Sequence, residues 1–270
     1  MATTSSHSGA AQQQAQQAID DFERSLAPGV WPGLSKPTLV AEIRSRVRDP
    51  FLLNQGGQPF CGPASVLFEL IRKQPLRYVE ICRSLFERGV FQAKSRLIEA
   101  SERLRQSQGR LRMGQADWLV LATLRESENL IFPVEPDAPD IIRNLGGMTK
   151  SWEMKGWVRE VLGYTHVKYE HTYIYGEFAA MREAEAAMAE GGVAFALITA
   201  EGLLSDKPPL LAVPNHWVTL LGNLSIQPGK FLQHDSGHVS FDVYSWAQRL
   251  HVDIDEGPFE DYFWGVVIGR

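Results

Sequence analysis

Four residues of the types that thiol hydrolases use recur in this sequence in a suggestive order. Gln55 stands six residues before Cys61, and His216 and Asp235 follow far downstream. A thiolate is a nucleophile, an imidazole can serve as its base, and a carboxylate can orient that imidazole. A glutamine amide can donate to the oxyanion that develops during acyl transfer. The set predicts a catalytic triad of Cys61, His216 and Asp235, with Gln55 in the oxyanion hole.

The setting of Cys61 favours the functional interpretation. Gly62-Pro63 directly follows it, and proline is well tolerated in the first turn of a helix. An apolar stripe at helical spacing continues from Val66 to Ile71. Cys61 is therefore expected at a helix N-terminus, where the helix dipole favours a thiolate. The other cysteine, Cys82, lies in an amphipathic stretch and is interpreted as a buried structural residue.

The loop before Cys61 is expected to carry the oxyanion donor. Gly56 and Gly57 can adopt backbone conformations that let the chain double back, so that the Gln55 amide faces the sulfur. The backbone N–H of Cys61 would be the second donor. Gln58, three residues before Cys61, is the alternative donor.

His216 opens an apolar run 155 residues after Cys61, a separation close to that of papain-like enzymes. If its strand pairs with residues 230–235 across a loop of about seven residues, Asp235 lies opposite His216. A tight turn near residues 227–230 would instead bring Asp242 nearer. Trp217 either shields the His216–Asp235 hydrogen bond from water or fills the core.

Composition narrows the class of protein. The chain has 270 residues, 44% hydrophobic and 22% charged, with a net charge of −5, so it is globular and carries no nucleic-acid footprint. No apolar run reaches the 18 or so residues of a membrane span, and the start lacks a signal peptide. Two cysteines predict synthesis in a reducing compartment such as the cytoplasm, and exclude zinc sites built on two Cys pairs. No metal and no cofactor is implied.

The periodicity along the chain predicts an α+β fold. Residues 1–17 are expected to form a disordered leader, because they contain hardly any large apolar side chains. Residues 18–270 are expected to form one catalytic domain, with a helical part to about 190 and an antiparallel sheet from about 191. Helices are predicted at 19–26, 38–47, 62–72, 77–88, 92–106, 115–126, 151–162, 177–190 and 244–250, and strands at 193–198, 216–221, 230–234, 239–243 and 262–268.

These blocks together resemble the active site of papain-like cysteine peptidases. The matching segments are Gln55-Gly56, Cys61-Gly62, residues 215–218 and residues 234–237. Together with the order of helices before sheet, the resemblance covers about a quarter of the chain. The nearest variety is the bacterial one with aspartate as the third residue. Two departures are the absence of a tryptophan after Cys61 and of room for a long inhibitory propeptide before it.

The resemblance implies a thiol protease that acts on a protein substrate. It also implies a bacterial effector or toxin, delivered into another cell by a type VI or related system without a Sec signal, with a cognate immunity protein as partner. A glutamine deamidase, transglutaminase or peptidoglycan amidase would use the same residues. A non-enzymatic interaction module, in which Cys61 and His216 fill the core, is the remaining alternative.

Overall fold

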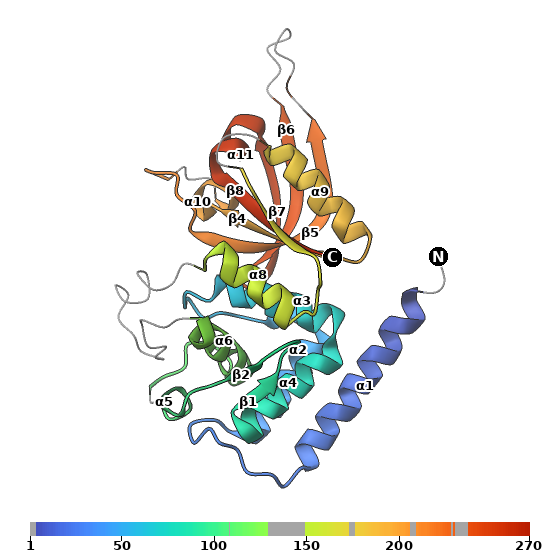
Figure 1. Cartoon of the computed structure of the whole chain (residues 1–270), viewed down its shortest axis with the longest axis vertical. Helices are drawn as coiled ribbons and strands as arrows, with labels where there is room; N and C mark the ends of the chain where they lie inside the picture. The colour runs from blue at the N-terminus through green and yellow to red at the C-terminus, as the bar shows by residue number, and fades with distance from the viewer. Residues whose placement is uncertain are drawn as a thin grey trace. The chain divides into compact units, whose positions relative to one another are not determined.

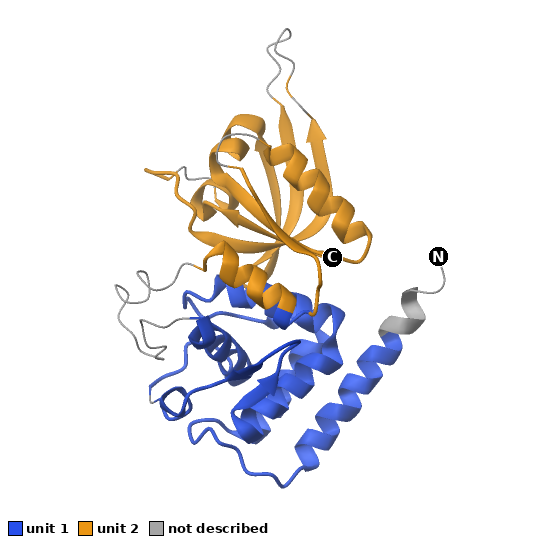
Figure 2. Cartoon of the chain, viewed as in Figure 1, with its two compact units in different colours: residues 1–147, 160–162 blue, residues 148–159, 163–270 orange. Residues whose placement is uncertain are grey.

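The computed structural model describes residues 4–107, 109–128, 149–172, 176–205, 209–227, 229 and 237–270. The chain divides into two compact units (Figure 2). The first comprises residues 1–147 and 160–162, and the second comprises residues 148–159 and 163–270. The fold is α+β, as the sequence predicts, with helices early and an antiparallel sheet late (Figure 1).

Over its described residues, the first unit is helical apart from one small hairpin. Its elements are α1 (Thr4–Arg24), α2 (Lys36–Arg48), the 3₁₀ turn η1 (Pro50–Leu52), α3 (Cys61–Lys73), α4 (Pro75–Arg88), β1 (Val90–Gln92), β2 (Leu97–Glu99), α5 (Glu102–Arg105) and α6 (Gln115–Glu128).

Helix α4 is central to this unit, because α1, α3 and α6 all pack against it. Tyr78 and Cys82 of α4 are fully buried, and Phe86 meets Phe22 of α1 edge-on with ring centroids 5.8 Å apart. Burial raises the pKa of the Cys82 thiol far above its ordinary value. Cys82 is therefore a structural residue, as its position in an amphipathic stretch indicates.

The second unit is a sheet with helices. It contains α8 (Ser151–Glu160, its last residue excepted), β3 (Val167–His171), α9 (Glu177–Ala189), β4 (Val193–Ile198), α10 (Ala200–Leu204), β5 (His216–Gln227), β6 (His238–Ser245), β7 (Gln248–Asp255), α11 (Glu256–Tyr262) and β8 (Phe263–Gly269). The six strands run in the order β3-β8-β4-β5-β6-β7, and every neighbouring pair is antiparallel.

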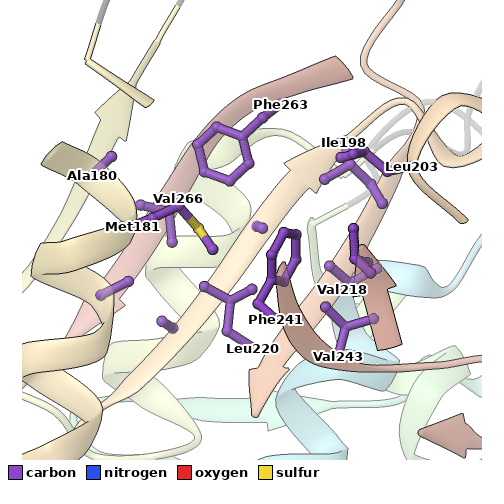
Figure 3. Packing of buried hydrophobic residues seen from close by; sticks show 14 of the residues in the cluster. Ala180, Met181, Ile198, Leu203, Val218, Leu220, Phe241, Val243, Phe263 and Val266 are labelled. Carbon is purple, nitrogen blue, oxygen red and sulfur yellow. The ribbon is translucent and has the colours of Figure 1, made fainter. Parts of the chain in front are cut away.

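Strand β4 lies inside the sheet, which explains its composition. All six of its residues are buried, so both faces of the strand are apolar. On one face of the sheet, alternate strand residues join side chains of α9, α10 and α11 in one core cluster (Figure 3). Labelled members include Met181, Phe241 and Phe263, and Val218 and Leu220 of β5 bring the strand of His216 into the same core.

Two expectations about the organisation were wrong. Helix α1 occupies Thr4–Arg24 where a disordered leader was expected to residue 17, because Ala15, Ile19 and Phe22 form an apolar stripe that is fully buried. The helix predicted over 92–106 is instead the β1–β2 hairpin followed by the short α5. The two compact units divide near residue 148, whereas the predicted helical and sheet parts were to meet near residue 190.

One error falls beside the candidate site. The helix predicted over 244–250 is a tight turn between β6 and β7. The strand predicted at 230–234 lies outside the described residues.

Candidate active site

Cys61 is the first residue of α3, as predicted. It has an exposed fraction of 7% and is a thiol, not part of a disulfide. The helix starts with the hydrogen bond from the Ala64 N–H to the Phe60 carbonyl (2.8 Å), and no side chain at Phe60 caps its first turn. A helix N-terminus without a side-chain cap presents N–H donors and positive dipole, so negative charge on sulfur is favoured there.

The loop before Cys61 makes the predicted reversal. The Gln58 N–H donates to the Gln55 carbonyl (3.0 Å), and both residues between them have positive φ: +59° at Gly56 and +70° at Gly57. Two central residues of this kind define a type I′ turn, which favours glycine. A Cβ atom at Gly56 would also lie 2.3 Å from the Arg112 carbonyl oxygen, so only glycine fits.

The two glutamines of this turn differ in burial. Gln55 is half-buried, whereas Gln58 has an exposed fraction of only 3%. A buried amide is better shielded from competing water than a half-exposed one, and this makes Gln58 a stronger candidate than the sequence indicated. Both remain candidates for the oxyanion donor.

A buried ion pair fixes the start of the loop. Asp117 of α6 is fully buried and accepts two hydrogen bonds from the Arg46 guanidinium, at 3.1 Å and 2.7 Å. Its Oδ2 also accepts the backbone N–H of Asn54 at 3.2 Å. Burial raises the pKa of the Asp117 carboxyl, while Arg46 and the Asn54 N–H oppose that shift. The sequence analysis missed this anchor, because Asp117 lies in a helix 56 residues after Cys61.

His216 is the first residue of β5, with an exposed fraction of 6%. Its Nε2 lies 2.7 Å from Oγ of Ser245, the last residue of β6. Burial lowers the pKa of His216 to about 4, and the Glu201 carboxylate opposes that shift. At neutral pH the ring is therefore uncharged. In the tautomer whose Nε2–H donates to Ser245, Nδ1 carries the lone pair of a general base.

An indole covers the same imidazole. Trp246 stacks on His216 with ring centroids 4.6 Å apart and planes inclined by 23°. Trp246 (φ +48°) and Ala247 (φ +61°) form the two-residue turn between β6 and β7. Such turns favour Asn-Gly, and a left-handed conformation costs other residues about 1–2 kcal/mol each. The chain thus accepts local strain at the position that holds Trp246 over His216.

The residue before His216 is also fixed. Asn215 Nδ2 donates to Glu201 Oε2 at 2.7 Å, and Asn215 Oδ1 accepts the Ala200 N–H at 2.9 Å. The Asn215 N–H donates to the Ile198 carbonyl at 3.0 Å. These contacts tie the start of β5 to α10 and hold the Glu201 carboxylate near His216.

The predicted third residue, Asp235, lies outside the described residues, in the part of the sequence that joins the ends of β5 and β6. The residue described beside His216 is Ser245. The strand pairing that was to bring Asp235 opposite His216 is not observed, because β5 continues to Gln227 and pairs with residues 238–245. Asp242 pairs with Gly222, six residues along β5, and bonds to His251 at 2.7 Å.

Sequence reasoning missed Ser245 and Trp246 as the neighbours of His216. It left two roles open for Trp217, as a shield or as a core residue. Trp217 is buried and donates to the Thr149 carbonyl at 2.7 Å, so it belongs to the core of the second unit. The sequence did contain a signal for Ser245: the residues before it alternate between polar and apolar, as in a strand, although a helix was predicted over 244–250.

The structure thus builds two sets of residues, one in each unit. Gln55, Gln58 and Cys61 share one loop and helix start in the first unit. His216, Ser245 and Trp246 share one end of the sheet in the second.

No protein-family model matches this sequence, and none of the curated proteins resembles it at a significant level. Among the described residues, no group of three His, Cys, Asp or Glu side chains is arranged to hold a metal ion. In the same part of the chain, no helix combines the length and the apolar character needed to cross a membrane.

Proposed function

We propose that this protein is a papain-like cysteine hydrolase that cleaves peptide bonds. The observation that carries the proposal is the environment of His216: an uncharged, buried imidazole held by Ser245 Oγ at 2.7 Å and covered by Trp246 in a strained turn. A histidine that only filled the core would also bond its ring nitrogens, but it would not require the strained turn that holds Trp246 over the ring.

In the proposed reaction, Cys61 attacks the carbonyl carbon of the scissile peptide as His216 accepts the thiol proton. The backbone N–H of Cys61 and one of the two glutamine amides, Gln55 or Gln58, stabilise the oxyanion. His216 then protonates the leaving amine, and water hydrolyses the thioester. Ser245 orients the imidazole, a role the sequence gave to Asp235.

Other acyl transfers use the same parts. A glutamine deamidase, a transglutaminase and a peptidoglycan amidase all proceed through a thioester on Cys61, and they differ only in acyl donor and acceptor. No described contact favours one of them over peptide hydrolysis. The reaction product, either a new chain terminus or a modified side chain, therefore distinguishes peptide hydrolysis from these alternatives.

The test compares wild type with Cys61→Ala on a protein extract, with detection of new chain termini and of deamidated glutamine side chains. We expect new termini with wild type and none with Cys61→Ala or His216→Ala. Cys82→Ala is the matched control, because Cys82 is fully buried in α4 and should not affect the chemistry. Deamidation without new termini would favour the alternative reactions, and equal products from wild type and Cys61→Ala would exclude thiol catalysis.

The biological setting is a separate proposal. We infer from the family resemblance that the protein is a bacterial effector or toxin, delivered by a type VI or related system and neutralised in the producing cell by an immunity protein. Expression of wild type but not Cys61→Ala should then arrest bacterial growth. Equal growth with both forms would count against toxicity through this thiol.

A further inference from the structure

Strand β7 is an outer edge of the six-stranded sheet. Among the described residues its only hydrogen-bonded neighbour is β6. It is eight residues long, and along such a strand the N–H and C=O groups of alternate residues point away from the neighbour. A long edge of this kind can accept another strand. The opposite edge, β3, has only five residues and carries Lys168, which suits an edge that stays unpaired.

One face of β7 is apolar. Val252 is buried in the core cluster, and Leu250 and Ile254 on either side of it are half-buried. Beside them runs a groove of about 450 Å³ between β7, α10 and α11, with further apolar lining from Leu203, Leu204, Pro258 and Tyr262. The core of the second unit therefore reaches this edge, and a strand added there would bury more apolar surface.

The other face of β7 carries Arg249 and His251 in its first half and Asp253 and Asp255 in its second half. Within the chain, Arg249 and His251 lie beside Asp242 of β6, and Asp253 and Asp255 lie beside His238. All four side chains are exposed. A strand with positive charge at one end and negative charge at the other complements an antiparallel copy of itself.

We propose that two copies of this chain pair through β7, antiparallel, about a twofold axis at Val252. In this register Val252 faces Val252 of the second copy and Leu250 faces Ile254. On the charged face Arg249 lies opposite Asp255, and His251 lies opposite Asp253. Each contact occurs twice, as a twofold interface requires. The result is a continuous sheet of twelve strands, and the proposal does not depend on any hydrolase activity.

Neighbouring registers are less favourable. A twofold axis at His251 sets the two His251 rings against each other and leaves Asp255 opposite the turn residue Ala247. An axis at Asp253 sets two carboxylates against each other, which is destabilising. Of these three registers, only the axis at Val252 pairs residues 249–255 with themselves, sets Arg249 opposite Asp255 on one face and sets apolar residues opposite each other on the other.

The experiment is sedimentation velocity on the full-length chain, over about 1 μM to 1 mM, a span that covers weak to moderate association. We expect wild type to dimerise. Arg249→Asp alone and Asp255→Arg alone should each weaken dimerisation about tenfold or more, because each places two like-charge pairs across the axis. Arg24→Asp, at an exposed side chain of α1, changes the net charge by the same amount as Arg249→Asp and should leave dimerisation unchanged.

Mixing separates the proposed contact from simple damage to the strand. When Arg249→Asp and Asp255→Arg proteins are combined, both cross-axis pairs again join opposite charges, so the mixture should form a heterodimer more tightly than either protein alone dimerises. Failure to form it would overturn the register. A wild type that stays monomeric throughout would overturn the dimer and leave the edge to a strand of another protein.

Discussion

Acidification should destabilise this protein through His216, and the effect can be worked out from the structure. The unfolded chain binds a proton at this histidine as the pH falls through 6.5, whereas burial in the folded chain lowers the pKa to about 4. Between these two values the unfolded state holds more protons than the folded state. Stability from this residue is therefore complete above pH 6.5 and is lost progressively as the pH falls toward 4.

The magnitude follows from the difference between the two pKa values. One pKa unit corresponds to about 1.4 kcal/mol, so the full change at His216 is about 3 kcal/mol in the free energy of unfolding. The Glu201 carboxylate opposes the shift, and its removal in Glu201→Gln should lower the His216 pKa further.

The assay is urea unfolding of wild type and His216→Gln at a series of pH values from about 7.5 to about 4.5, across the window of the shift. Carboxylates and the other histidines titrate in both proteins, so the difference between the two unfolding free energies isolates His216. We expect wild type to lose about 2.5 kcal/mol relative to the variant by pH 4.5, which is most of the full change. His166→Gln, at an exposed histidine, should follow wild type.

Two results would refute the reasoning. The first is parallel pH profiles for wild type and His216→Gln. The second is an NMR titration of the His216 imidazole with a midpoint near 6.5, which would mean that the ring is solvated and does not occupy the buried position beside Ser245 and Trp246.

The remaining predictions concern the turn and the proposed chemistry. Ser245→Ala should slow turnover about tenfold, because it removes one hydrogen bond that orients the imidazole. Asp235→Ala should stay near wild type in the same steady-state kinetics. The reverse ranking would favour Asp235 as the third residue. Ala247→Gly should raise the free energy of unfolding by about 0.5–1 kcal/mol in urea melts, since relief of a left-handed residue exceeds the entropic cost of glycine, and a loss would contradict the strained turn. Gln55→Ala or Gln58→Ala, whichever is the oxyanion donor, should lower kcat about 10²–10³-fold with KM almost unchanged, and no effect from either would remove the loop from the mechanism.

Much of the fold was predictable because it depends on local patterns. The stripe from Val66 to Ile71 and the buried run 193–198 became α3 and β4 at almost the expected bounds. The error over 92–106 arises because β1 and β2 have three residues each, too few to display a period of two. The error over 244–250 has another cause: the turn at Trp246-Ala247 lacks the Asn or Gly that usually marks it.

In the candidate site, too, local sequence determined some features and tertiary packing determined the others. The sequence alone determined the position of Cys61 at a helix start and the reversal at Gly56-Gly57, because a proline in the first turn and a glycine pair act on the adjacent backbone. The tertiary structure decided the partners of His216. Strand register is set by packing across the whole sheet, and the pairing of β5 with β6 brings Ser245 and Trp246 to the imidazole. Burial, which lowers the His216 pKa, likewise exists only once those strands have packed.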